Sequence, residues 1–208
     1  MPDSPLLLVG LGNPGEQYAK NRHNAGFILI DAIHDEYRFK PWRAKFEGML
    51  SEGVIAGRKT YLLKPMTYMN VSGVSVGPAM RFFKIKPDAV VVAHDEMDLA
   101  AGKLKVKTGG GDAGHNGLKS ITEHVGSDYR RVRIGVGHPG TSARVTGHVL
   151  SNFSKADAEW FVPLVKAMVD AAPHLADDDD AGFMSRVALL TQPPKPKKPK
   201  PEPTPKED

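Results

Sequence analysis

Two glycine-rich segments of the chain each carry a histidine followed by an asparagine. The first is GLGNPGEQYAKNRHNAG, residues 10–26, and the second is GGGDAGHNGL, residues 109–118. Glycine lets the backbone take positive φ angles and approach a ligand closely. Histidine transfers protons near neutral pH, and asparagine offers a donor and an acceptor without charge. Two such loops in one chain indicate a polar site for recognition and hydrolysis.

A carboxylate stands at a place in the chain that suits a partner for a histidine. Asp95 belongs to HDEMD, residues 94–98, which directly follows the apolar run 89–93. Open α/β sheets place their sites at the C-terminal ends of central strands. Asp95 is therefore a candidate partner for His23 of the first segment. The alternatives at this point are a histidine that only caps or lies exposed near a helix start, and a solvated acidic turn.

The same segments raise two further alternatives, a dinucleotide site and a metal site. Residues 10–15 match G-x-G-x-x-G, but that motif opens into an apolar helix. Here the polar residues Glu16, Gln17, Lys20, Asn21 and Arg22 follow instead. Asp31, at the distance of the motif's acidic residue, falls inside a helical pattern. The acidic segment 94–98 offers metal ligands but lacks H-x-H or H-E-x-x-H spacing. We expect neither a cofactor nor a metal.

Hydrophobic patterning predicts strands that alternate with helices. Apolar and alternating runs indicate strands at 6–9, 49–55, 59–63, 89–93, 103–107 and 132–136. Apolar spacings near 3.6 indicate helices at 24–39, 70–83, 116–125, 154–175 and 180–190. Such alternation is typical of an α/β fold, and the hairpin at 49–63 adds an antiparallel pair. We expect a single α/β domain with a mixed sheet.

KPMTYMNVSG, residues 64–73, lies between a predicted strand and a predicted helix. Asn70 is well placed to cap that helix, and Asn116 stands in the same position before a later one. Capping does not explain the neighbouring Met66, Tyr68 and Met69, which are typical of a flexible apolar patch.

Basic residues gather in the second half of the chain. Alternate lysines share one face of the predicted strand at 103–107, and more basic residues follow. The set is Lys103, Lys105, Lys107, Lys119, Arg130, Arg131 and Arg133. A solvated strand face is the usual explanation, but such a patch can also hold phosphates. Few aromatic residues lie nearby, so we expect contacts to a nucleic-acid backbone more than to bases.

Composition limits the class of protein. The 208 residues suffice for one domain with a substantial core, and cysteine is absent, which excludes disulfides, thiolate zinc sites and cysteine nucleophiles. No Lys or Arg precedes the first apolar run, and no apolar run approaches the ~18 residues of a membrane span. We expect a cytoplasmic protein without membrane association.

The C-terminal segment 193–208 differs in composition from the rest of the chain. It holds seven Pro, five Lys, three acidic residues and no apolar residue. It therefore contributes +2 of the formal net charge of +4, and nothing in it can form a core. We expect a catalytic domain at 1–191 and a disordered Pro/Lys-rich tail at 192–208.

Five segments, taken together, resemble the bacterial-type peptidyl-tRNA hydrolases. In order they are GLGNPG-x-x-Y-x-x-x-RHN-x-G, KPMTYMNVSG, HDEMDL, GGGDAGHNGLKSI and RVRIGVGHPG. The resemblance covers roughly residues 6–190, and five linked motifs are far more specific than any one. It implies a twisted mixed β-sheet flanked by helices in one domain, which acts as a monomer without metal or cofactor.

The resemblance also implies an activity, cleavage of the ester that joins a peptide to the terminal ribose of tRNA. It implies that His23 is the general base, that Asp95 orients it, and that Asn13 positions the ester carbonyl or the attacking water. Asn70 and Asn116 would clamp the peptide and the tRNA end. The residues implied to line the cleft are Tyr18, Tyr68, Met69, Gly114 and His115. Those implied to contact tRNA phosphates are Lys105, Lys107 and Arg133.

The chemistry of these residues agrees with that activity. An ester is an activated acyl group, so a water molecule deprotonated by histidine is a sufficient nucleophile. The chain offers no cysteine and no G-x-S-x-G serine. An Asp–His pair with an amide donor follows the logic of a catalytic triad, with water in place of serine.

The chain departs from the family pattern at three places, none of them a proposed catalytic position. Asn21 stands where Thr is usual, Ala100 and Ala101 replace the usual proline, and 147–148 is Gly-His. A protein of the same fold that binds RNA without hydrolysis is the competing interpretation. Loss of His23 or Asp95 would be its mark, and both are present.

Overall fold

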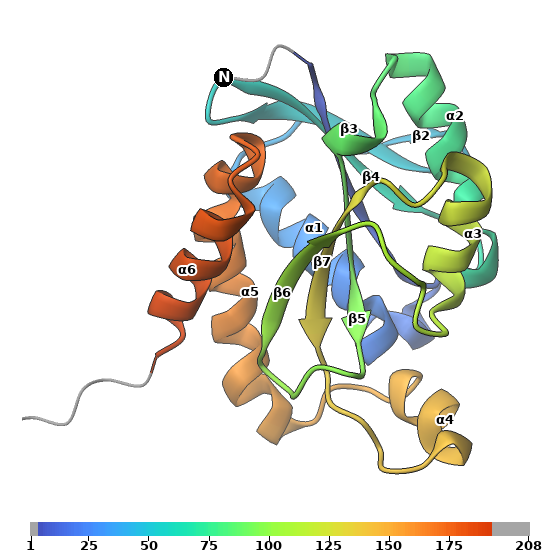
Figure 1. Ribbon diagram of the computed structural model, residues 1–208, viewed down its shortest axis with the longest axis vertical. Helices are drawn as coiled ribbons and strands as arrows, with labels where there is room; N and C mark the ends of the chain where they lie inside the picture. Colours follow the sequence, from blue (N-terminus) through green and yellow to red (C-terminus); the bar gives the residue numbers. More distant parts are fainter. Residues whose placement is uncertain (1–3, 193–208) are drawn as a thin grey trace, which may run out of the picture.

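A seven-stranded mixed sheet forms the centre of the molecule, with the strand order β2-β3-β4-β1-β5-β7-β6 (Figure 1). The computed structural model describes residues 4–192. Strands β1, β4, β5 and β7 are parallel, whereas β2, β3 and β6 each pair antiparallel with a neighbour. The strands are β1 (Leu6–Gly10), β2 (Arg43–Lys45), β3 (Gly48–Ile55), β4 (Arg58–Pro65), β5 (Val90–Glu96), β6 (Leu104–Thr108) and β7 (Arg130–Gly135).

Helices cover both faces of this sheet. They are α1 (Ala25–Glu36), α2 (Gly73–Phe83), α3 (Asn116–Val125), α4 (Val145–Val149), α5 (Lys155–Ala176) and α6 (Asp180–Leu190). Short 3-10 turns join them, at η1 (Glu16–Tyr18), η2 (Arg22–Asn24), η3 (Met69–Val71), η4 (Pro87–Ala89) and η5 (Ser142–Arg144). The expected α/β fold with a mixed sheet is therefore confirmed.

Strand β1 shows why the sequence folds into these layers. Leu6 and Leu8 belong to the core beneath α1, α5 and α6, whereas Leu7 and Val9 belong to the core beneath α2 and α3. Because successive side chains of a strand point to opposite faces, a strand covered on both sides reads as a continuous apolar run. The run LLLV at the start of the chain is such a strand.

The structure differs from the sequence prediction mainly in small elements. Strand β2 has three exposed residues and α4 has five residues, so neither carries a periodic apolar pattern. Helix α1 ends at Glu36 rather than at residue 39, because the backbone turns to positive φ at Arg38. Pro78 lies inside α2. Of the expected tail, 192–208, residues 193–208 lie outside the described residues.

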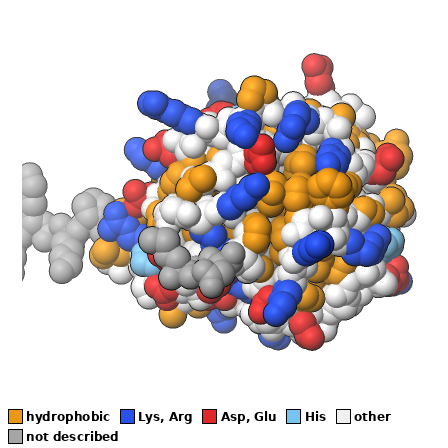
Figure 2. Space-filling view, turned by 90° about the horizontal axis from the view of Figure 1, so that it is seen from above, with side chains coloured by type: hydrophobic (Ala, Val, Ile, Leu, Met, Phe, Trp, Pro, Cys, Tyr) orange, Lys and Arg blue, Asp and Glu red, His pale blue; other side chains and the backbone are white. Residues whose placement is uncertain are grey.

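The two ends of the parallel strands form different surfaces. In Figure 1 the arrowheads of β5 and β7 point toward α4, so the carboxyl ends of the parallel strands lie on that side. Figure 2 shows the opposite, upper face, where Lys and Arg side chains are dispersed among hydrophobic ones. Among the described residues, no helix is both long enough and apolar enough to cross a membrane.

Candidate active site

His23 reaches the centre of the sheet because α1 begins unusually close to the strands. It lies in η2, directly before α1. A Cβ atom on Gly26 would overlap the carbonyl oxygen of Ala93 and the backbone of Leu11. Only glycine therefore allows the first turn of α1 to lie against β1 and β5. This contact brings His23 over the carboxyl end of β5, where Asp95 lies.

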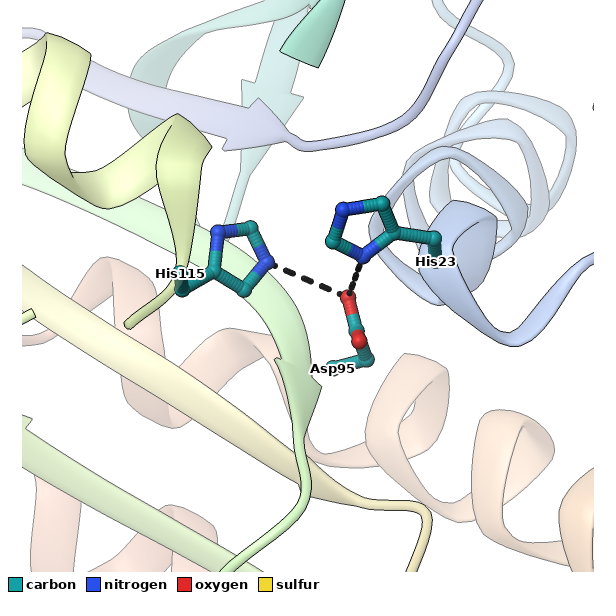
Figure 3. Close-up of side chains that lie close together, drawn as sticks. All are labelled: His23, Asp95 and His115. Atoms are coloured by element: carbon teal, nitrogen blue, oxygen red, sulfur yellow. Dashed lines mark hydrogen bonds and ion pairs between the residues drawn. The ribbon is translucent and has the colours of Figure 1, made fainter. Parts of the chain in front are cut away.

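Two histidines share one oxygen of the Asp95 carboxylate (Figure 3). The distance from His23 Nδ1 to Asp95 Oδ1 is 2.9 Å, and that from His115 Nε2 to the same oxygen is 3.2 Å. The Asp95 side chain is only 2% exposed, and the two rings lie 4.9 Å apart. The structure thus joins the two glycine-rich segments through the acidic segment between them.

The hydrogen bonds of His115 fix where the protons lie in this cluster. His115 Nδ1 accepts from the backbone N–H groups of Gly117 and Leu118, so this side chain caps α3. A nitrogen that accepts carries no proton, so the proton of His115 is on Nε2 and is donated to Asp95. His23 donates its Nδ1–H to the same oxygen. The remaining nitrogen of His23, Nε2, is left with a lone pair that can accept a proton.

The electrostatics of Asp95 favour the carboxylate. Burial by itself raises the pKa of Asp95, but the hydrogen bonds from His115 and His23 outweigh it and hold the pKa below its usual range. Two donors that bond only to the charged form act in this direction. Asp95 is therefore ionised near neutral pH, the state in which a carboxylate can stabilise a protonated histidine.

Asn13 is held in place by Asn24, a residue that the sequence analysis did not single out. The backbone N–H of Asn13 donates to Asn24 Oδ1, and Asn24 Nδ2 donates to the Asn13 carbonyl oxygen. Asn13 Oδ1 accepts from the N–H of Met69 at 2.8 Å. Because Oδ1 is engaged, the Nδ2 group remains to donate to a ligand. Asn24 is the asparagine that directly follows His23 in the RHN motif, so the sequence did place it beside the proposed site.

A cavity of about 530 Å³ lies above this cluster. Nine of the residues expected in the site line it: Asn13, His23, Tyr68, Met69, Asn70, Asp95, Gly114, His115 and Asn116. An apolar wall from the α4 segment was not expected, and it consists of Val145, Val149 and Leu150. Tyr18 lies half-buried in η1 and is not among the described residues that line the cavity.

The basic residues separate into two groups. Lys105 and Lys107 lie exposed on the edge strand β6, and Arg133 lies opposite Lys105 on β7. The Nε of Arg133 donates to Glu96 at 2.9 Å. Arg130 and Arg131, in contrast, are buried, so their inclusion in an exposed phosphate patch was wrong. Their guanidinium groups bind carboxylates and carbonyl oxygens inside the protein.

The residues that cap α2 and α3 also differ from those expected from the sequence. The interpretation of Asn70 and Asn116 as caps is wrong, because Ser72 precedes α2 without a side-chain cap and His115 caps α3. Asn70 is exposed within η3 and lines the cavity. A histidine that accepts from two backbone amides is an uncommon cap, and residue preferences at helix starts do not predict it.

The three residues of the cluster are also the described group that comes nearest to a metal site, since ligand atoms of His23, Asp95 and His115 lie within 4.8 Å of one another. Their hydrogen bonds oppose this use. A metal on His115 Nε2 would displace its proton while Nδ1 still faces two N–H donors, and the ring would carry no proton at all. The donor set therefore suits a hydrogen-bonded acid–base cluster.

Comparisons with known proteins agree with this geometry. The sequence model of the family described as peptidyl-tRNA hydrolase matches residues 7–198. A peptidyl-tRNA hydrolase of Rhodospirillum centenum is 56% identical over 189 residues, which are 91% of this chain and 83% of that protein. One of Granulibacter bethesdensis is 57% identical and covers 90% of this chain and 97% of that protein.

A solved structure gives the same result. The crystal structure of peptidyl-tRNA hydrolase from Acinetobacter baumannii is 41% identical, has a TM-score of 0.84, and covers 88% of this chain and 93% of that chain. The resemblance found in the sequence is thereby confirmed. The chain belongs to the peptidyl-tRNA hydrolase family, whose reaction is the hydrolysis of peptidyl-tRNA.

Proposed function

We propose that His23 is the general base in the hydrolysis of peptidyl-tRNA by this chain. The observation that supports the proposal is the direction of the hydrogen bonds around Asp95. His115 can only donate to Asp95, and His23 donates through Nδ1, so the lone pair of His23 is on Nε2. His23 lines the cavity of about 530 Å³, the proposed place of the substrate ester and the attacking water.

The reaction then follows with balanced protons. His23 Nε2 takes one proton from water as the water oxygen attacks the ester carbonyl carbon, and a tetrahedral oxyanion forms. The ionised Asp95 stabilises the resulting imidazolium, and Asn13 Nδ2 donates to the developing oxyanion. When the intermediate collapses, the ribose oxygen leaves and takes the proton from His23. The products are a peptide carboxylic acid and a tRNA with a free terminal hydroxyl group.

The cavity suggests how the substrate lies. Tyr68, Met69, Val149 of α4 and Leu150, which directly follows α4, form an apolar wall suited to peptide side chains. Asn70 lies in the same rim, so it suits the peptide backbone. Asn116 lies at the start of α3, and we assign it to the tRNA end. Tyr18 is the one expected contact that would need a movement of η1 to reach the substrate.

The body of tRNA would lie against the edge of the sheet. Lys105 and Lys107 are exposed on β6, and Arg133 is paired through Nε alone, which leaves its terminal nitrogens for a phosphate. A charge patch of this kind gives affinity and orientation without base specificity. We therefore assign Lys105, Lys107 and Arg133 to tRNA phosphates.

Replacing His23→Ala tests the general base. General base catalysis typically supplies about 10²–10⁴-fold, so we expect kcat to fall by that factor while the fold is retained. His34→Ala is a matched control, because His34 Nδ1 also contacts a carboxylate, Asp35, at 3.0 Å and is similarly buried, but lies at the far end of α1. A loss under about tenfold for His23→Ala, with substrate saturating, contradicts the assignment.

A second test concerns metal. Because the His115 hydrogen bonds suit protons rather than a metal ion, we expect hydrolysis to continue in EDTA. The control is a peptidyl-ester substrate whose own structure needs no Mg²⁺. Activity that disappears with chelator and returns with Zn²⁺ or Mn²⁺ contradicts this expectation.

We also propose that the chain acts as a monomer in the cytoplasm, with a catalytic domain at 1–191 and a separate tail at 192–208. Peptidyl-tRNA is the substrate of the family, and the cavity with His23, Asp95 and His115 lies within the proposed catalytic domain. Sedimentation at enzyme concentrations used for assay tests the monomer. A dimer that persists at these concentrations contradicts it.

A further inference from the structure

A second, smaller cavity lies beside the catalytic cluster, between β5, β6, β7 and the glycine loop 109–113. Its volume is about 50 Å³, and the polar residues that line it are His94, Glu96, Lys107, Arg131 and Arg133. This is more than the ~10–15 Å³ that one water molecule needs. The cavity lies between His94, the direct neighbour of Asp95, and two residues of the proposed phosphate patch, Lys107 and Arg133.

Two buried polar atoms at this cavity have no hydrogen-bond partner among the described residues. They are His94 Nε2 and Arg131 Nε, on residues that are 1% and 2% exposed. A buried polar group without a partner costs about 1–3 kcal/mol, so such atoms are rare in native proteins. Both residues line the same cavity, which indicates a shared partner.

The two atoms are complementary. His94 Nδ1 donates to the carbonyl oxygen of Asp95 at 2.7 Å, so the proton of the ring is on Nδ1 and Nε2 is an acceptor. Burial and the nearby His115 lower the pKa of His94 to about 3, which keeps the ring neutral. Arg131 Nε–H can only donate. A partner must therefore donate to one atom and accept from the other, as water does.

We propose that one water molecule bridges His94 Nε2 and Arg131 Nε, and that His94 is thereby a positioning residue for the Asp95–His115 pair. The ring of His94 is fixed on one side by its bond to the Asp95 backbone and on the other by the water. It packs edge-on against the ring of His115, with centroids 5.0 Å apart. His115 in turn donates to Asp95.

Arg131 gives the water a fixed anchor. Its terminal nitrogens donate to the carbonyl oxygens of Gly110 and Gly111, and its guanidinium group lies over the Tyr129 ring. The bridge therefore connects the glycine loop to the catalytic carboxylate.

Lys107 and Arg133 also line the cavity, and Arg133 is paired with Glu96. An anion between the two unpartnered atoms could accept from Arg131 Nε–H but would face the lone pair of His94 Nε2, whereas water donates to one atom and accepts from the other.

Three substitutions of His94 test the bridge. This inference rests on the proposed role of His23 and Asp95. His94→Phe keeps a ring but removes both polar atoms, and we expect kcat to fall by about 10–100-fold, with KM and salt dependence unchanged. His94→Gln places an amide oxygen near the position of Nε2, whereas His94→Asn places its amide near the position of Nδ1. We expect Gln to restore most of kcat and Asn to restore little.

Other outcomes overturn the inference. If Asn restores kcat as well as Gln does, only the bond to the Asp95 backbone matters. If His94→Phe, corrected for its folded fraction, keeps full kcat, His94 has no positioning role. A change in KM and salt slope instead of kcat would place a phosphate in the cavity.

The wild-type protein gives a test that needs no variant and no activity, so its failure is distinct from failure of the proposed function. Long-range ¹H–¹⁵N spectra should show His94 protonated on Nδ1 only, from pH 5 to 8. A crystal structure should show a water within hydrogen-bond distance of both Nε2 and Nε. A doubly protonated ring, an anion or an empty cavity contradicts the inference.

Discussion

The two ends of the parallel strands carry the same arrangement of side chains with opposite consequences. At the amino ends, Arg58 of β4 and Arg130 of β7 both donate to one oxygen of Asp178, at 2.8 and 2.7 Å. At the carboxyl ends, His23 and His115 both contact one oxygen of Asp95. In each case two basic side chains share a carboxylate between distant segments.

The two clusters differ in whether their basic groups can give up a proton and in how exposed their shared carboxylates are. Arginine does not lose its proton in proteins, so the Arg58–Asp178–Arg130 cluster is a static ion pair that ties the α5–α6 turn to the sheet. Each histidine, in contrast, has one nitrogen that donates and one that accepts. The Asp178 side chain is 42% exposed, whereas that of Asp95 is 2% exposed and lies below a cavity. The shared carboxylate is common to both ends, and exchangeable protons distinguish the end that carries the candidate site.

The largest difference between the two clusters is expected when each shared carboxylate is replaced by an amide. In Asp95→Asn the amide presents N–H groups to a histidine that must donate, so His23 or His115 takes the wrong tautomer. We expect kcat to fall by about 10²–10⁴-fold. Asp178→Asn should leave kcat within about twofold. Steady-state kinetics on peptidyl-tRNA check both, and equal losses would show that the two clusters have the same role.

The arginine cluster should matter for stability instead. Arg130→Ala removes bonds to Asp178, Asp180 and the carbonyl oxygen of Leu175. Loss of one partner of a buried pair costs about 3–5 kcal/mol, but these carboxylates are partly exposed, so we expect a decrease of about 2 kcal/mol in the free energy of unfolding. Urea unfolding measures it. A large loss of kcat in the folded variant would contradict the assignment of this cluster to stability rather than to catalysis.

The comparison also shows what the sequence could predict. The candidate site at the carboxyl ends could be predicted, because glycine, histidine and asparagine within short motifs are typical of polar loops, and an apolar run indicates the strand that carries Asp95 near its carboxyl end. The regular elements were predicted for the same reason, through their apolar periodicity. The cluster at the amino ends could not be predicted. Arg58, Arg130 and Asp178 lie far apart in the chain, and the sequence pattern predicts an exposed position for an isolated charged residue.

Two features of the site also escaped prediction. The apolar wall of the cavity comes from α4, whose five residues are too few for a periodic pattern. The buried position of Arg131 depends on the carbonyl oxygens of Gly110 and Gly111, and such backbone partners leave no pattern in side-chain types. Both features arise from tertiary contacts rather than from local sequence.

The buried His94 should make the carboxyl end sensitive to acid. His94 faces Asp95, His115 and Arg131, and its pKa of about 3 lies below the ordinary value of 6.5. Between these values the unfolded chain binds a proton that the folded protein does not, so stability falls as pH is lowered. We expect about 1 kcal/mol per pH unit through this window.

His94→Gln, which cannot titrate, should flatten this dependence. Urea unfolding at several pH values between 4 and 7 measures the slope for both proteins. The lowered pKa of Asp95 has its effect mainly below the ordinary value of 3.8, outside most of this range. Parallel slopes for the wild type and the variant would mean that other groups cause the acid sensitivity.

Exposed lysines on the edge strand β6 and on β4 should also differ, by a smaller amount. Lys107→Ala should weaken binding of the full tRNA substrate and reduce the salt slope by roughly one unit, because one phosphate contact is lost. Lys59→Ala is the matched control, since Lys59 is an exposed strand lysine at the amino end of β4. KM measured over a range of salt concentrations checks this, and identical slopes for both variants would reduce Lys107 to a solvated side chain.

The smallest effect is expected from deletion of residues 193–208, which lie outside the described residues. The segment has no apolar residue, so its removal should cost no core and leave Tm and kcat nearly unchanged. Its five lysines can still attract RNA weakly, which would raise KM on deletion at low salt and disappear as salt screens the charge. Thermal unfolding and salt-dependent KM of the truncated chain measure these effects. A large drop in Tm or kcat would mean that the segment belongs to the folded domain, and the proposed boundary at residue 192 would be wrong.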